Sequence, residues 1–583
     1  MTAVASKHLV RAASLSELRS AGRLVVHLGG PAVCLFADGE GVRAVDNRCP
    51  HMGFPLHRGS VCDGILTCHW HHARFDLATG GTFDQFADEL RQFPVQLDGD
   101  DVLVDLGTPA DPARHQRKRL RDGLERDISL VVAKATIALQ EPDPSGVEVF
   151  RAGLDFGVAR RGGGWFRGLT TLTCLMNLVP RLEPEDRALA LYHGLADVAS
   201  DSATGPPRFP LPPLPGSPPA PERLAGWFRR FVEVRDAEGA ERALVSAIRG
   251  GASPDQLAGM LFAAATDHRY LDGGHTLDFV NKALEALDTA GWERAEAVLS
   301  SLPAQLAGAM RMEEANSWRN PVDLVALLER GFAELPAAVA TGRGARGPWD
   351  GRAALVEAVL HAEPASIVDA LLEALRAGAG AVELASAVSF AAATRIARFP
   401  TSNEFGDWDT ALHTFTFANA VEQGLRRSPS PELLRGVLDA AMSVHLDRFL
   451  NVPATRLPLP APGADPRSLL SRLPHLLDQQ QQVDQARQLV VSFLGAGGEP
   501  GRLVAALGAA LVRENRNFHT IQCVEAAVHQ HELLAGSPDA RVPLVAAAGY
   551  LAAHATTTRS QRQTFEIALR LHRGEKLYED DAD

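Results

Sequence analysis

The stretch that decides the fold of the N-terminal region begins with Cys49-Pro50-His51 and is completed by Cys68-His69-Trp70-His71. Each segment pairs one Cys with one His, in the spacings C-x-H and C-x-x-H. Thiolate and imidazole groups are common protein ligands for transition metals. The two segments therefore predict a metal centre held between neighbouring loops, with the ligands Cys49, His51, Cys68 and His71.

The mixed ligand set distinguishes this centre from commoner ones. A plain ferredoxin cluster takes four Cys, and a structural Cys₂His₂ zinc site usually pairs like ligands, as C-x₂₋₄-C and H-x₃₋₅-H. A Rieske [2Fe–2S] cluster takes two Cys on one iron and two His on the other. We therefore expect a [2Fe–2S] cluster at these residues, with a zinc site as the alternative.

The residues that follow each pair agree with this expectation. They are Gly53-Phe54-Pro55-Leu56 after the first and Ala73-Arg74-Phe75-Asp76-Leu77-Ala78-Thr79-Gly80-Gly81 after the second. In these segments residues 1–107 resemble the Rieske ferredoxin and Rieske oxygenase family. The resemblance implies a small all-β sandwich that carries the cluster on two loops and transfers electrons.

The other Cys and His residues of this region are expected to be structural. His57, His69 and His72 are expected on the cluster loops or at the surface, and Cys34 and Cys62 as small buried residues.

The resemblance also predicts a low reduction potential. High-potential respiratory members of the family carry hydroxyl groups that donate hydrogen bonds to the cluster and its ligand, whereas Ala73 and Phe75 have no hydroxyl. Because fewer donors to the sulfurs lower the potential, we expect a ferredoxin-like donor of electrons.

Composition limits the classes of function. A chain of 583 residues exceeds one hydrophobic core, so we expect at least two domains. A net charge of −13 argues against nucleic acid as a partner.

Residues 1–7 lack the apolar run of a signal peptide, and no apolar segment is long enough to span a membrane. Six Cys give no disulfide framework, and we expect a cytoplasmic protein.

The chain beyond the β region reads as helical. Residues 108–127 contain a basic run, Arg114 to Arg121, and are expected to form a linker helix. This run is either a solvated helix face or a docking patch for an acidic electron donor. From residue 128 to residue 583, Ala, Leu and Val recur at helical spacing, which predicts an all-α domain.

Sequence repeats indicate that the helical domain is duplicated, approximately as 128–340 and 341–583. The segment Leu244 to Ala252 returns as Leu371 to Ala379, and Phe262-Ala-Ala-Ala-Thr266 returns as Phe390-Ala-Ala-Ala-Thr394. A His-Thr pair follows each copy, and further His residues occur in related segments. These histidines are His193, His275, His413 and His519.

The repeated histidines suggest a second metal site. Each is expected to start a helix, and where an apolar residue stands at i+4 (Phe279, Phe417, Cys523) the His shares the buried face. They are either structural histidines copied by duplication or converging ligands for a second metal, with iron favoured. Nearby carboxylates that could complete the site are Asp197, Asp267, Asp272, Glu314, Glu404, Asp407 and Glu514, with His268, His445 and His529 as further candidates.

The second domain of Rieske oxygenases is not expected in this chain. That domain is β-rich and holds mononuclear iron through D-x-x-H-x₄-H. Asp272 and His275 begin that motif, but Val280 stands where the second His is required. The helical region has only a faint likeness to questin-oxidase-like proteins, from which no residue is carried over.

The favoured hypothesis is an oxidoreductase in which the cluster relays single electrons to a metal site in the helical domain. That site would activate dioxygen or reduce a small organic substrate, with a ferredoxin or an NAD(P)H-dependent reductase as electron donor. The alternative is a redox-responsive binding or electron-carrier protein whose helical domain is a non-catalytic scaffold.

Overall fold

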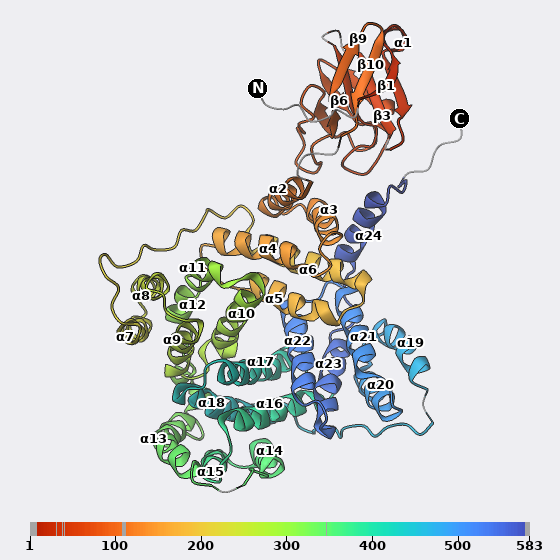
Figure 1. The fold of residues 1–583 in the computed structure, drawn as a ribbon. Helices are drawn as coiled ribbons and strands as arrows, with labels where there is room; N and C mark the ends of the chain where they lie inside the picture. The colour runs from red at the N-terminus through yellow and green to blue at the C-terminus, as the bar shows by residue number, and fades with distance from the viewer. Residues whose placement is uncertain are drawn as a thin grey trace. The chain divides into compact units, whose positions relative to one another are not determined.

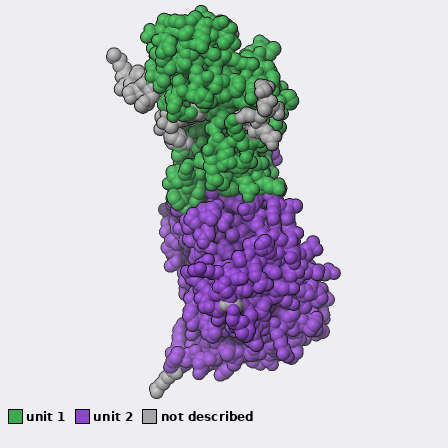
Figure 2. Space-filling model, turned by 90° about the vertical axis from the view of Figure 1, so that its right-hand side faces the viewer, with its two compact units in different colours: residues 1–144, 563–583 green, residues 145–562 purple. Residues whose placement is uncertain are grey.

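The computed structural model describes residues 9–30, 32–37, 39, 41–107, 112–345, 347–463 and 465–577. The chain forms two compact units, residues 1–144 with 563–583 and residues 145–562 (Figure 2). The first unit extends beyond the β region expected over 1–107, because it includes the next two helices and a C-terminal segment. Part of the predicted boundary, residues 108–111, lies outside the described residues.

The first unit contains three small antiparallel sheets (Figure 1). Their strand orders are β1-β10-β9, β2-β3-β4-β8 and β5-β6-β7. The strands are β1 (Leu9–Ser14), β2 (Arg23–His27), β3 (Ala32–Ala37), β4 (Val42–Asp46), β5 (Ser60–Cys62), β6 (Ile65–Thr67), β7 (Arg74–Asp76), β8 (Gln92–Phe93), β9 (Val95–Asp98) and β10 (Asp101–Asp105), with the short helix α1 (Leu15–Ala21) after β1. A small antiparallel β domain followed by a large helical region confirms the predicted fold class.

Strand β3 is buried on both faces and separates two hydrophobic clusters. Val33 and Leu35 belong to one cluster, whereas Cys34 and Phe36 belong to the other. This alternation follows from the two-residue period of a strand. The cluster around Cys34 also contains Cys49 and Cys68, so the predicted ligand loops are fixed to the core of the domain.

The prediction that Cys62 is buried was wrong, whereas Cys34 is fully buried as expected. Cys62 ends β5, which lies at the edge of its three-stranded sheet, and every residue of that strand is exposed. An edge strand has a neighbouring strand on one side only, so its residues are more open to solvent than those of a central strand.

Two helices follow the β domain within the first unit, α2 (Pro112–Glu125) and α3 (Ser129–Gln140). Helix α2 carries the basic run, in which Lys118 forms an ion pair with Asp122 one turn later at 2.6 Å. The described part of the chain contains no helix that is long and apolar enough to cross a membrane.

The second unit is built from α-helices (Figure 1). They are α4 (Val147–Arg160), α5 (Arg167–Leu178), α6 (Pro184–Ser202), α7 (Pro221–Glu233), α8 (Ala237–Arg249), α9 (Pro254–Asp267), α10 (His275–Ala290), α11 (Ala295–Leu299), α12 (Pro303–Gly308), α13 (Leu324–Gly342), α14 (Arg352–His361), α15 (Pro364–Arg376), α16 (Ala381–Ala397), α17 (Phe405–Arg427), α18 (Pro431–Asp447), α19 (Pro466–Leu477), α20 (Val483–Gly495), α21 (Pro500–Val512), α22 (Phe518–Leu533) and α23 (Arg541–Ala553); α24 (Ser560–His572) passes from this unit into the first.

The repeated sequence segments have matching local structure. Helices α8 and α15 end in the same way, with Gly251 (φ 82°) and Gly378 (φ 97°) in the left-handed region that favours glycine. In the next helices, Thr266 and Thr394 each donate a hydrogen bond to the carbonyl four residues earlier. The triplets α8-α9-α10 and α15-α16-α17 are therefore locally equivalent, and duplication of the whole domain stays a prediction.

Candidate functional site

The two Cys-His loops of the β domain share one backbone design. The Cys49 amide donates to the carbonyl of Phe54 at 2.8 Å, and the Gly53 amide donates back to Cys49 at 2.8 Å. In the second loop the Cys68 amide donates to Ala73 at 2.8 Å and the His72 amide returns to Cys68 at 3.0 Å. In each loop the Cys amide thus donates to the carbonyl five residues later, and the amide four residues after the Cys donates back to the Cys carbonyl.

The residue at i+4 has a positive φ in both loops. Gly53 (φ 80°) adopts this conformation without a steric penalty, whereas His72 (φ 62°) adopts it with a side chain. His72 therefore occupies the turn position of the loop, one residue beyond the predicted ligand His71.

The four predicted ligands converge between these loops. The side chains of Cys49 and Cys68 are buried and hydrogen-bonded to each other. The rings of His51 and His71 lie edge to face with centroids 4.9 Å apart. The buried Nδ1 of His51 has no hydrogen-bond partner, which is unfavourable unless a ligand occupies that position.

The electrostatics of these residues suit metal binding. The hydrogen bond between the two thiols lowers the pKa of Cys68 and raises that of Cys49, so one proton is shared between them and Cys68 is the thiol that ionises first. Burial lowers the pKa of His51 to about 4 and keeps its imidazole neutral. Thiolate and neutral imidazole are the forms that bind metals, so the four residues fit the group that their spacing predicts.

The other histidines of this region take part in local structure. His57 Nδ1 lies 3.0 Å from the side-chain nitrogen of Asn47 and 3.1 Å from its oxygen, and His69 Nε2 lies 3.0 Å from Ser60 Oγ. Neither is grouped with the four predicted ligands.

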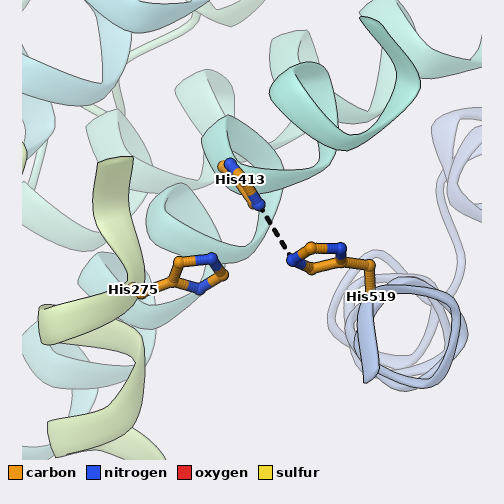
Figure 3. Close-up of side chains that lie close together, drawn as sticks. All are labelled: His275, His413 and His519. Carbon is orange, nitrogen blue, oxygen red and sulfur yellow. Dashed lines mark hydrogen bonds between the residues drawn. The ribbon is translucent and has the colours of Figure 1, made fainter. Parts of the chain in front are cut away.

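A second candidate site lies in the helical unit, where three of the four repeated histidines meet (Figure 3). One nitrogen from each of His275, His413 and His519 lies within 4.8 Å of the other two. His413 Nε2 and His519 Nε2 are 3.1 Å apart, and the His275 and His413 ring centroids are 4.3 Å apart. We call these residues the histidine triad.

Close packing of α10 against α17 brings two members of the triad together. Gly274 (φ 95°) precedes His275, and a Cβ atom there would lie 2.9 Å from Cβ of Phe417. Only glycine combines this conformation with such a close approach. Helix α17 in turn packs on α22, which carries His519.

The environment of the triad suits a metal ion. Burial is the main cause that lowers the pKa of His275 to about 3 and that of His413 to about 4, so both stay neutral at physiological pH. His275 Nδ1 is buried without a hydrogen-bond partner. Three imidazoles that face one another are a ligand set for iron, zinc, copper or nickel.

The carboxylate of Asp409 contacts the triad residue His519 at the ring nitrogen that faces away from the other two histidines. Its Oδ2 lies 3.3 Å from His519 Nδ1, and its other oxygen accepts a hydrogen bond from the hydroxyl of Tyr550. A carboxylate on the far nitrogen of a metal-binding His fixes the tautomer and the ring orientation. Asp409 thereby directs His519 Nε2 toward His413.

The prediction that all four histidines converge was wrong for His193. Its Nε2 donates instead to the carbonyl of Val512 at 2.9 Å, at the end of α21, where helix carbonyls lack an intrahelical partner. The prediction that each His starts a helix holds for His275 and His519 only. His413 lies well inside α17 because that helix begins at Phe405, and His193 lies within α6, which begins at Pro184.

The other candidate ligands lie in separate interactions. Asp267 pairs with Arg229, Asp272 accepts from Thr276, Glu314 pairs with Arg235, Glu404 and Asp407 cap α17, Glu514 pairs with Arg516, Asp197 lies beside Thr171, and His268 bonds Glu313. His445 and His529 are not members of the triad.

Asp409, Tyr550 and His554 were not predicted from the sequence. The available signal was spacing, because Asp409 lies four residues before His413 and therefore shares its helix face. Tyr550 and His554 are also four residues apart, and His554 Nε2 lies 3.8 Å from Asp409 Oδ1. Nothing in the sequence connects this second pair with the triad.

A pocket of 910 Å³ opens beside this network, lined in part by Phe405, Trp408, Thr520 and His554. Trp408 and Thr520 are the chain neighbours of Asp409 and His519. A pocket of this size matches the volume of small-molecule sites.

Comparisons with known proteins agree with the geometry of the β domain. The family model described as "Rieske [2Fe-2S] domain" matches residues 8–94. The 3-phenylpropionate/cinnamic acid dioxygenase ferredoxin subunit of Shigella flexneri is 33% identical over 78 residues, which cover 13% of this chain and 74% of the relative. The ferredoxin component of biphenyl 2,3-dioxygenase from Rhodococcus jostii (strain RHA1) is 41% identical over 64 residues, 11% of this chain and 60% of the relative.

Two further matches also cover less than a fifth of this chain. Apoptosis-inducing factor 3 of Homo sapiens is 33% identical over 91 residues, and the chain spans only 15% of its length. The solved structure of the ferredoxin of carbazole 1,9a-dioxygenase from Nocardioides aromaticivorans IC177 shares 29% identity, with 17% of this chain and 96% of that chain covered and a TM-score of 0.16. The helical unit lies outside these matches. Through residues 8–94, the chain belongs to the Rieske [2Fe–2S] domain family.

Proposed function

We propose that this protein is an oxidoreductase that passes single electrons from its Rieske domain to a metal centre at the histidine triad. In this proposal Cys49, Cys68, His51 and His71 hold the cluster, and His275, His413 and His519 hold the second metal. The substrate is a small organic molecule, with dioxygen as the oxidant. A ferredoxin or an NAD(P)H-dependent reductase supplies the electrons.

The observation that carries the proposal is the convergence of the triad with Asp409 behind it. When bound, the [2Fe–2S] group would exchange one electron at a time, and a redox-active metal such as iron would be the place where those electrons are used. Relatives of the β domain are ferredoxin components of dioxygenase systems, which supports dioxygen as the oxidant.

The chain's own residues supply what such a centre needs. Asp409 holds the Nδ1 proton of His519, so the lone pair of Nε2 faces the triad. Burial keeps His275 and His413 neutral and therefore able to bind metal without first losing a proton. The pocket lined in part by Thr520 and His554 has room for a small organic molecule, and the triad histidines are not among its lining residues.

Metal analysis tests the second site. The variant Cys49→Ser with Cys68→Ser removes the cluster, and the remaining metal is then measured after expression in metal-replete medium. We expect about one metal ion per chain, which His275→Ala or His413→Ala removes. His193→Gln is the matched control, because it alters a buried His of the same repeats that lies outside the triad. A folded cluster-free chain without metal would contradict the proposal and favour the scaffold alternative.

A second measurement separates electron delivery from metal binding. Wild-type protein with NADPH and a surrogate reductase should consume dioxygen, and His413→Ala should still show reduction of the cluster but lose this consumption. Equal consumption in both proteins would show that the triad does not receive the electrons.

A further inference from the structure

A single lysine of α3 is buried against the first ligand loop of the Rieske domain. Helix α3 is otherwise largely apolar on its buried positions, yet Lys134 is only 8% exposed. A buried ammonium group is strongly destabilising unless hydrogen bonds and counter-charges compensate for lost water. Its partners therefore indicate why a lysine occupies this position.

Those partners are the loop that carries Cys49 and His51. Lys134 Nζ donates to the carbonyl of Pro50 at 2.5 Å and to the carbonyl of His51 at 2.8 Å. Two consecutive carbonyls of one tight loop are thus held by one side chain. The contact fixes the backbone of a predicted ligand from outside the domain that the family model matches, which ends at residue 94.

Two cations and one carboxylate meet at this contact. Asp88 Oδ2 lies 3.5 Å from Lys134 Nζ, but the same carboxylate also forms an ion pair with Arg119 of α2. One buried carboxylate therefore faces two cations. Because Lys134 Nζ lies 2.8 Å from the carbonyl of His51, its charge is adjacent to the first ligand loop.

We propose that Lys134 is a positioning residue that holds the first cluster loop and raises the reduction potential of the cluster. Reduction adds a negative charge, and a fixed positive charge in a poorly solvated environment stabilises the reduced form. The inference rests on the proposed cluster ligands and is independent of the histidine triad. The Rieske-type paramagnetic resonance signal of the wild-type protein tests those ligands separately.

The test is a spectroelectrochemical titration of full-length variants at constant pH. At the wild-type midpoint, Lys134→Met should lower the ratio of reduced to oxidised cluster at least tenfold, which is about 59 mV for one electron. Lys134→Arg keeps the charge and should stay within threefold. Lys118→Met removes a lysine from the exposed face of α2 and is the matched control, which should stay within twofold.

Asp88→Asn distinguishes a charge effect from a loosened loop. It removes a negative charge from the same cluster of groups and should shift the ratio in the opposite direction. If Lys134→Met loses its cluster, Asp88→Asn is measured alone. A higher ratio of reduced to oxidised cluster in Asp88→Asn then supports the proposal, and an unchanged or lower ratio contradicts it. An unchanged midpoint in Lys134→Met with an intact cluster, shifts of the same sign in both variants, or loss of the cluster from both would overturn the assignment.

Discussion

His413 Nε2 lies 3.1 Å from His519 Nε2, although 106 positions separate the two residues in the sequence. Asp409 Oδ2 lies 3.3 Å from His519 Nδ1, which favours the tautomer with the proton on Nδ1 and a lone pair on Nε2 toward His413. A shared proton or a metal ion satisfies this arrangement, and the third imidazole, His275, favours the metal.

Asp409→Asn should weaken metal binding at the triad by about 10- to 100-fold, because the carboxylate that orients His519 is lost. Competition with a chromophoric chelator measures the affinity in the cluster-free background. Asp407→Asn is the matched control on the same helix, since Asp407 caps the start of α17 instead of contacting a triad histidine. Equal affinity in the two variants would exclude the supporting role of Asp409.

Reduced wild-type protein should give the anisotropic paramagnetic resonance spectrum of a Rieske cluster, with nitrogen coupling from two imidazoles. Cys68→Ser should abolish this spectrum because it removes a ligand. The control Cys62→Ser should retain it, since that thiol lies exposed on an edge strand. A spectrum with sulfur ligation alone would disprove the assignment of His51 and His71.

The cluster should have a midpoint potential of about −150 mV, at the low end of the range for Rieske centres. Ala73 and Phe75 are fully buried beside the second loop and carry no hydroxyl group. Backbone amides, such as those of His51 for Cys49 and His71 for Cys68, donate to the sulfurs. A potential several tenths of a volt more positive would show that other groups donate to the cluster.

His193→Gln should make the protein less sensitive to acid. Burial lowers the pKa of His193 to about 4, so as the pH falls the unfolded chain takes up a proton near pH 6.5 while the folded chain does not. The contribution of neutral His193 to the free energy of unfolding is complete above pH 6.5. It decreases as the pH falls toward 4, by up to about 1.4 kcal/mol per pH unit.

Glutamine can still donate to the Val512 carbonyl but does not titrate. Urea midpoints of helical circular dichroism between pH 4.5 and 7.5 measure the effect, and the decline toward low pH should be shallower in the variant. Parallel profiles would show that His193 already takes up its proton in the folded state.

The sequence predicted the Rieske domain from a few local residues. A Cys and a His two or three positions apart on one tight loop face the same space wherever that loop lies, so spacing alone predicts a ligand set. The helical character of the second unit was equally predictable, because apolar periodicity is a property of each helix by itself.

The tertiary structure decided which side chains meet. Sequence similarity placed His193 with the triad histidines, but the end of α21 lies beside α6, and the Val512 carbonyl there accepts a hydrogen bond from His193. The contacts of Asp409 and Lys134, on which their proposed roles rest, arise in the same way, because their helices pack against a distant residue or loop. Contacts between residues far apart in the chain depend on how whole helix faces pack, and that packing is set by many apolar contacts rather than by the spacing of any one motif.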